Sequence, residues 1–242
     1  MRILHPFLLI LAGQLGSLAQ EDLDRKAFIF PVATDTARVV LKAHLQMQPL
    51  SAFTVCLRFQ SELTRNYSLF SYASKVSNNE ILIHYDNPNT YSLLMRGGIV
   101  TFNVTAKLAS AIGKEHICLS WESATGLVDF WWNGQSLPRK LLMKGQSVTP
   151  DAFIILGQKQ DSSGGDFDLN QSFVGEIEDV YMWDRELSSE EVCLVWDNRP
   201  ADGSVIDWRA LHYQIIGEVV VAPSTVSACR AECSCQTLRW PQ

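Results

Sequence analysis

The chain has 242 residues, of which 47% are hydrophobic and 10% aromatic, and this is enough for one sizeable core in a single domain. Its formal net charge of −6 disfavours a nucleic-acid partner, because phosphate backbones are bound by positively charged surfaces. An acidic chain is compatible with calcium, which takes oxygen ligands and carboxylates above all.

The first 19 residues have the features of a secretory signal peptide. A single basic residue, Arg2, precedes an apolar run over residues 7–12, and Ser17 and Ala19 provide the small residues of a cleavage site before Gln20. The apolar run is far too short to span a bilayer, and no later stretch approaches the necessary length. We therefore expect a secreted, extracellular protein without membrane insertion.

Most of the remaining chain consists of short runs in which apolar and polar residues alternate between turn residues. This period of two is typical of strands in an antiparallel two-sheet sandwich. Asn133 and Gly134 follow an aromatic run and give the strongest local signal for a hairpin. The sequence predicts an all-β fold, with strands over residues 38–42, 52–59, 80–85, 116–121, 127–132 and 153–156.

Residues 187–196 break the strand pattern. They offer a serine cap, acidic residues in the first turn and apolar residues at helical spacing. We expect one short helix here, and a return to extended structure over residues 206–208.

A motif near the middle of the chain carries a family resemblance. His116, Cys118, Ser120, Trp121 and Ser123 fill the pattern His-x-Cys-x-Ser/Thr-Trp-x-Ser/Thr, which is the signature of the pentraxin family. Six flanking segments agree in order with that family: residues 28–31, 53–56, 67–72, 155–158, 174–177 and 182–184. The chain thus resembles a short secreted pentraxin over residues 20–223, followed by a cysteine-rich tail over residues 224–242.

The resemblance implies a fold and an assembly. Pentraxin subunits are jelly-roll sandwiches with one helix on a sheet, and they form cyclic homo-oligomers, usually pentamers. Each subunit presents one ligand site on a common face of the ring. Weak single sites then become useful through avidity.

The six cysteines fall into two groups. Cys56 and Cys118 match the paired positions of the family, so the resemblance implies a disulfide between them; closing a loop of about 60 residues contributes roughly 4 kcal/mol in the chain-entropy model. The other four allow three pairings, and both two further intrachain bridges and a disulfide between chains stay open. These four are Cys193, Cys229, Cys233 and Cys235.

The loop over residues 158–171 contains three aspartates, several amides and two glycines. Calcium takes about six to eight oxygen ligands, so such a loop is chemically apt, although it does not have the EF-hand spacing. On spacing alone, a solvated acidic loop is the better interpretation. The resemblance instead implies a site for two calcium ions, with ligands from two regions of the chain: Asn78, Asn79, Gln160 through its carbonyl, Asp161, Asp168 and Gln171.

Lys159 departs from the family pattern, in which a glutamate at this position binds both ions. An ammonium removes the shared ligand and repels calcium, and Asn78 removes a further negative charge usual in the family. We therefore expect weaker calcium binding, with one ion or none. Lys159 either replaces the cation and meets phosphate directly, or points into solvent at a decayed site.

The resemblance places the ligand pocket at His84, Leu94 and Ile99. None of them is acidic, so the sequence does not favour phosphocholine as the ligand. His84 has an ordinary pKa near physiological pH, but a lone histidine at a strand end is more often merely exposed.

Three sequons begin at Asn66, Asn103 and Asn170. Asn170 lies between two predicted calcium ligands, where a glycan would crowd the binding face. We therefore expect glycans at Asn66 and Asn103.

Two functional classes other than recognition need consideration. Glu176, Glu178 and Asp179 superficially resemble the strand carboxylates of jelly-roll glycoside hydrolases, but Val180 and Tyr181 follow where those enzymes add another glutamate. A divergent pentraxin that serves as a structural or mucosal scaffold is the second alternative, favoured by Lys159 and the tail cysteines.

The interpretation that we favour is a non-enzymatic, calcium-dependent, lectin-like pattern-recognition protein of innate immunity. Its ligands are phosphate-bearing or other anionic groups and polysaccharides on microbes or cell debris. In the family the opposite face of the ring engages complement, and the matching contact positions are Asn133 and Trp196. These are not the acidic and tyrosyl residues usual there, so the resemblance leaves complement engagement open.

Overall fold

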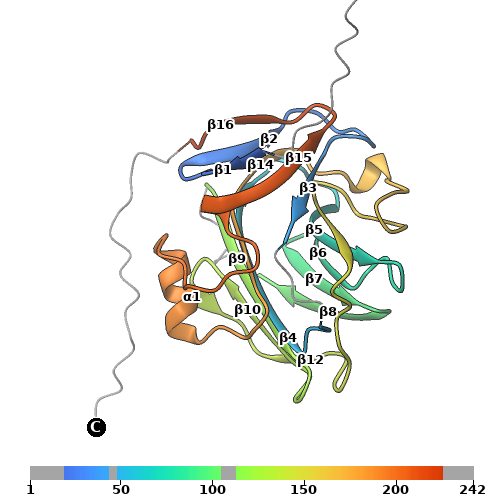
Figure 1. Ribbon diagram of the computed structural model, residues 1–242, viewed down its shortest axis with the longest axis vertical. Coiled ribbons are helices and arrows are strands. Elements are labelled where there is room, and N and C mark those ends of the chain that lie inside the picture. The colour runs from blue at the N-terminus through green and yellow to red at the C-terminus, as the bar shows by residue number, and fades with distance from the viewer. Residues whose placement is uncertain (1–18, 44–47, 105–112, 226–242) are drawn as a thin grey trace, which may run out of the picture.

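The computed structural model describes residues 19–43, 48–104 and 113–225 (Figure 1). The predicted signal peptide, apart from Ala19, and the three tail cysteines lie outside the described residues. Two eight-stranded sheets, in which every pairing is antiparallel, form a sandwich with one α-helix. Within the described part of the chain, no helix has both the length and the apolar composition needed to cross a membrane.

The two sheets are named here sheet A and sheet B. In spatial order, sheet A contains β1 (Ala19–Glu21), β15 (Leu211–Ile216), β3 (Arg38–Lys42), β13 (Ala152–Leu156), β5 (Tyr67–Ser74), β6 (Ile81–Asp86), β7 (Thr90–Met95) and β8 (Gly98–Asn103). Sheet B contains β11 (Gln135–Ser136), β10 (Leu127–Trp132), β9 (Glu115–Glu122), β4 (Ala52–Gln60), β14 (Gly175–Trp183), β2 (Lys26–Phe30) and β16 (Val220–Pro223), and β12 (Lys140–Leu141) also pairs with β10. The all-β prediction is confirmed, and each of the six predicted strands is present.

The inner faces of the sheets form one aromatic core. Trp121, Trp183 and Trp208 are fully buried, and each indole Nε1 donates to a backbone carbonyl, at 2.8, 3.1 and 2.8 Å respectively. A buried indole needs such an acceptor, because an unpaired N–H in the core is costly. Trp121 belongs to the family motif and lies on β9. The motif therefore includes a residue of the buried core.

Cys56 and Cys118 form a disulfide, as the resemblance implies. They lie directly opposite each other in the pairing of β4 with β9, with Cα atoms 4.1 Å apart. His116 approaches the same sulfur pair, but both thiols are consumed in the disulfide, so this group is structural and not a metal site. The bond fixes the centre of sheet B.

The predicted hairpin is confirmed. Asn133 and Gly134 have φ values of 47° and 77°, which suit the tight turn that joins β10 to β11. Extended structure over residues 206–208 is only partly correct. Asp207 is extended, but its side chain accepts from the backbone N–H of Arg209, and this cap starts the 3-10 helix η2 (Trp208–Ala210).

The predicted helix is α1 (Ser189–Trp196), and it lies against the outside of sheet B (Figure 1). Ser188 and Glu191 form a capping box at its start. At its end, the guanidinium of Arg58 lies 4.9 Å from the ring centre of Trp196 and pairs with Asp179 at 2.9 Å. Cys193 lies half-buried on this helix.

Gln160 holds the loop over residues 158–171 on the outer face of sheet A. Phe70 and Tyr72 point into the core, so Ser71 between them faces outward. The fully buried Gln160 amide donates to the carbonyls of Ser71 and Phe153, both at 3.0 Å, and its Oε1 accepts from the Gly164 N–H at 2.8 Å. The side chain therefore fixes the loop relative to β5 and β13.

Gln160→Ala is expected to loosen this loop and to lower the free energy of unfolding by about 1–3 kcal/mol, because it removes the hydrogen bonds of a buried amide to Ser71, Phe153 and Gly164. Hydrogen exchange of residues 158–168 and urea denaturation measure the two effects. Gln171→Ala is the matched control, since its amide makes a hydrogen bond of 3.2 Å near the surface of the same loop. Equal exchange in the two variants would contradict the anchoring role.

Candidate functional site

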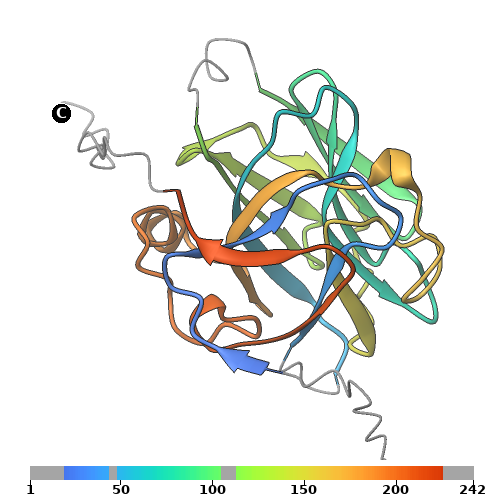
Figure 2. The same ribbon diagram turned by 90° about the horizontal axis from the view of Figure 1, so that it is seen from above.

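The two regions predicted to bind metal meet on the outer face of sheet A. Asn78 and Asn79 lie in the connection between β5 and β6. The Nδ2 of Asn78 donates to the backbone carbonyl of Asp161 at 3.1 Å, across 83 residues of sequence. The structure thus brings Asn78, Asn79, Gln160 and Asp161 together, on the side of the sandwich away from α1 (Figure 2).

Lys159 is turned into this site. Its Nζ lies 2.8 Å from Oδ1 of Asp161, and only 21% of its side chain is exposed. An ammonium therefore already neutralises one of the carboxylates that the resemblance assigns to calcium.

Asp168 and Gln171 are hydrogen-bonded to each other at the end of the loop. Asp168 caps η1 (Leu169–Gln171): its Oδ1 accepts from the backbone N–H and Nδ2 of Asn170, at 2.9 and 3.1 Å, and its Oδ2 accepts from Gln171. The backbone hydrogen bond of Asn170 is the main cause that lowers the pKa of Asp168, and the charge of Lys159 acts in the same direction. The carboxylate stays ionised, but both its oxygens are already hydrogen-bonded.

These residues do not fit the two-calcium site of the family. Two carboxylates, Asp161 and Asp168, face the ammonium of Lys159, whereas calcium is bound best by anionic oxygens that no protein cation opposes. Oδ1 of Asn79 is a buried acceptor with no hydrogen-bond donor in the described part of the chain. That atom, the carbonyl of Gln160 and the carboxylate of Asp161 are the oxygens left for a single cation, in competition with Lys159.

The predicted ligand-pocket residues lie beside the loop. Leu94 on β7 pairs directly with Ile99 on β8, and with Leu82 on β6 at its other side. Leu82 in turn pairs with Ser71, on which Gln160 is anchored. Ile99 is 56% exposed, so an apolar surface extends from the loop toward the edge of sheet A.

His84 lies on the same strand as Leu82, two residues along, and it is buried, so the expectation of an exposed histidine was wrong. Its Nε2 is 3.8 Å from Oδ1 of Asp86. Burial lowers the pKa of His84, Asp86 acts in the opposite direction, and the charge of Lys159 lowers it further. The imidazole is therefore neutral at physiological pH, and it is an uncharged polar group of the predicted ligand pocket.

The sequons differ in their surroundings. Asn66 and Asn103 are exposed, at the start of β5 and the end of β8. The Nδ2 of Asn66 donates to Asp86 at 3.2 Å, and that of Asn170 donates to the predicted metal ligand Asp168 at 3.1 Å. Thr105, the third residue of the Asn103 sequon, lies outside the described residues.

The carboxylates of β14 are engaged in ion pairs. Lys114 Nζ lies 3.2 Å from Glu176 and 2.9 Å from Glu178, and Asp179 pairs with Arg58. A bulge between residues 178 and 181 interrupts the strand. These ion pairs give the acidic residues of β14 a structural role.

The two positions matched to complement contact lie together on the outside of sheet B. The side chain of Asn133 accepts from the backbone N–H of His116 at 2.8 Å, and the ring of Trp196 packs on His116 with centroids 5.3 Å apart. Both side chains therefore have structural roles at the end of α1.

Three residues of this region were not predicted from the sequence. Ser71 anchors Gln160, Leu82 is buried between Ser71 and Leu94 in the sheet, and Asp86 accepts hydrogen bonds from Asn66 and Ser92. Strand alternation alone indicates that Leu82 and His84 share a face, but only the sheet register shows what they lie against.

Comparison with known proteins agrees with the fold. The sequence model of the Pentaxin family matches residues 26–223. C-reactive protein of Homo sapiens is 46% identical over 217 residues, which cover 89% of this chain and 95% of that protein. Serum amyloid P-component of Cavia porcellus is 46% identical over 209 residues, which cover 86% of this chain and 92% of that protein.

A solved structure shows the same fold. The native heptameric SAP-like pentraxin from Limulus polyphemus superposes with a TM-score of 0.72 at 23% identity, covering 86% of this chain and 99% of that one. The shared sandwich, the disulfide of Cys56 with Cys118 and the match over residues 26–223 lead to one conclusion. The chain belongs to the pentraxin (Pentaxin) family.

Proposed function

We propose that this secreted pentraxin is a pattern-recognition protein that binds phosphate-bearing or other anionic ligands, including polysaccharides, on microbes or cell debris. The loop site is the place on sheet A where Asn78 and Asn79 meet residues 159–161. The observation that carries the proposal is the ammonium of Lys159, held 2.8 Å from Asp161 in this loop site. A lysine ammonium is a point charge well suited to phosphate. The charge of Lys159 acts on neutral His84, and Leu94 and Ile99 pair with each other on the same sheet, so an anion with an uncharged remainder suits the surface better than phosphocholine.

Assembly into a ring is part of this proposal. The Limulus polyphemus pentraxin is heptameric, which supports a cyclic homo-oligomer here, and we propose a pentamer from the resemblance to the short pentraxins. Repeated weak sites on one face bind a repetitive surface far more tightly than one site does.

Calcium is proposed to bind weakly, with at most one ion. Lys159 would have to leave Asp161 before that carboxylate could reach a metal. In this proposal Lys159 contacts the anion, Gln160 fixes the loop, and Asp161 positions the ammonium. No catalytic role is assigned, because the acidic residues of β14 are held in ion pairs by Lys114 and Arg58.

The same ion pair also supports a second candidate. If Asp161 fully satisfies the ammonium, the face binds no anion and the protein serves as a structural or mucosal scaffold. Ligand binding in the absence of calcium separates the two candidates.

Lys159→Glu is expected to bind calcium at least about tenfold more tightly than the wild type, because it replaces a repelling charge with an anionic ligand. Isothermal titration calorimetry on the full oligomer measures this difference. Lys144→Glu, which alters an exposed lysine outside the site, is the control and should leave calcium affinity unchanged. Equally tight calcium binding by wild type and Lys159→Glu would refute the role given to Lys159.

Retention on a phosphate-monoester resin tests the ligand. The wild type should stay bound in chelator, whereas Lys159→Glu should bind only when calcium is present. Loss of wild-type retention in chelator together with absent calcium binding would favour the scaffold.

We further propose glycans on Asn66 and Asn103 but not on Asn170, which lies between Asp168 and Gln171 in the proposed binding face. Mass spectrometry before and after enzymatic deglycosylation should show one glycan lost in each of Asn66→Gln and Asn103→Gln. Asn170→Gln should leave the glycan mass unchanged, and a loss there would place a glycan in the binding face.

A further inference from the structure

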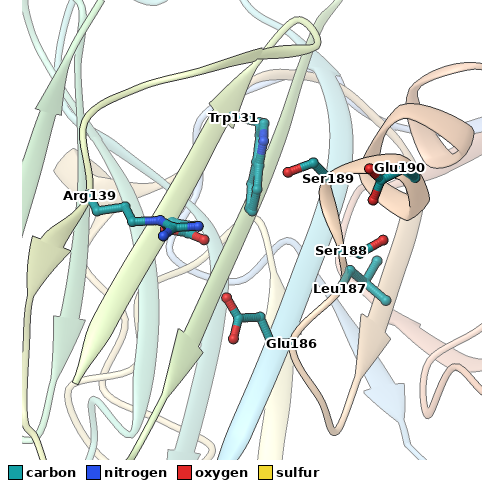
Figure 3. A pocket seen from close by; sticks show the side chains of 8 residues that line it. Trp131, Arg139, Glu186, Leu187, Ser188, Ser189 and Glu190 are labelled. Atoms are coloured by element: carbon teal, nitrogen blue, oxygen red, sulfur yellow. The ribbon is translucent and has the colours of Figure 1, made fainter. Parts of the chain in front are cut away.

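A pocket of about 450 Å³ lies on the outer face of sheet B (Figure 3). This volume is within the range of about 300–1,000 Å³ that small-ligand sites occupy. Its walls come from β10, from the segment between β11 and β12, and from the start of α1, whereas the loop site lies on sheet A. The lining residues are Asp129, Trp131, Arg139, Glu186, Leu187, Ser188, Ser189 and Glu190.

The charges in this pocket are unbalanced. Three carboxylates, those of Asp129, Glu186 and Glu190, face the single guanidinium of Arg139. Arg139 Nε lies 2.6 Å from Oδ1 of Asp129, and in the described part of the chain neither glutamate forms an ion pair. The nearby Arg185 is occupied, because it binds Glu191 through two hydrogen bonds of 3.0 and 2.7 Å.

Asp129 is the deepest charge in the pocket. Asp129 is only 6% exposed. Arg139 lies close to its Oδ1, but this oxygen accepts no hydrogen bond of good geometry from any residue in the described part of the chain. A buried carboxylate without such donors is costly. The Arg139 side chain is 63% exposed, so its guanidinium is a counter-ion at the surface that another cation can displace.

Glu186 stands next to Asp129 at the pocket wall. Partial desolvation raises the pKa of Glu186, and the charge of Asp129 and a hydrogen bond with it raise this pKa further, while Arg139 opposes the shift. Two carboxylates this close repel each other, and a cation placed between them relieves that repulsion.

The start of α1 does not offer an anion site. Ser188 already accepts from the backbone N–H of Glu191, and Glu190 and Glu191 occupy the first turn. A metal ion fits no better, since the pocket's carboxylates do not converge on one point in the described part of the chain. Trp131 forms one wall beside Ser189 (Figure 3), and an indole attracts organic cations.

We propose that this pocket binds an organic cation, the ammonium or guanidinium group of a lysine or arginine side chain or of a free amine. The cation lies between Glu186 and Asp129, displaces Arg139 from Asp129 and packs on Trp131. The wall is well fixed, because the Leu187 N–H donates to Thr54 at 3.0 Å and the hydroxyl of Thr54 donates to the carbonyl of Arg185 at 2.8 Å.

Surface plasmon resonance on the immobilised full-length protein tests the proposal. The analytes are acetylated and amidated Gly-X-Gly peptides, in which X is lysine, arginine, norleucine or glutamate, together with spermidine. The lysine and arginine peptides should bind saturably, and raised salt should weaken them. Binding of spermidine alone would identify the source as a free amine, and binding of the peptides alone would identify a protein partner; either result sustains a cation site.

Three variants sharpen the test. Glu186→Gln should lower the affinity for the cationic analytes about tenfold. Glu218→Gln, at an exposed glutamate outside the pocket, should leave this affinity unchanged. Arg139→Gln should raise the affinity for the cationic analytes, because it removes the guanidinium that competes with them for Asp129. Thermal unfolding by circular dichroism confirms that each variant is folded, and Asp129 is left intact because it is buried.

The opposite pattern overturns the proposal. Equal binding of the norleucine and lysine peptides would show an apolar site. Binding of the glutamate peptide that is lost in Arg139→Gln would show an anion site. Absence of binding by every analyte up to millimolar concentration would leave the pocket without this function.

Discussion

The burial of one face of each sheet against the other is the constraint on which the remaining structure depends. Phe130 of sheet B stacks on Phe102 and packs on Tyr91 of sheet A, with ring centroids 4.8 and 5.4 Å apart. Because side chains alternate along a strand, every core residue leaves its neighbours facing outward. The outer face of sheet A is thereby free for the 158–171 loop, and that of sheet B for α1 and the pocket beside it.

The outer faces of the two sheets each contain an ion pair between residues of a proposed site. On sheet A, Lys159 lies 2.8 Å from Asp161, and on sheet B, Arg139 lies 2.6 Å from Asp129. Each pair joins a cation to a carboxylate of the same site, so each face already contains a counter-ion from its own chain. A ligand of either face must compete with that internal partner, which favours binding through many weak sites on an oligomer over one tight site.

Much of the fold could be predicted from local sequence. The alternating runs predicted six strands, Asn133 and Gly134 predicted the hairpin, and the serine cap predicted α1, because these signals depend on neighbours within a few residues. Two expectations were wrong for a common reason. Trp208 was expected to be extended and His84 to be exposed, yet the Asp207 cap turns the chain at Trp208, and His84 is buried in sheet A beside Asp86.

The sequence by itself determined the family, the two-sheet class and the disulfide pair, since the family motif and strand alternation depend only on the order of the residues. Only the tertiary structure decided which charges meet. Lys159 turns toward Asp161, Gln160 is consumed in holding the loop, and Asp129 meets Arg139 and Glu186 across separate elements. These contacts depend on sheet register and loop packing, because a charge is neutralised by what lies within a few ångströms and not by what lies nearby in sequence.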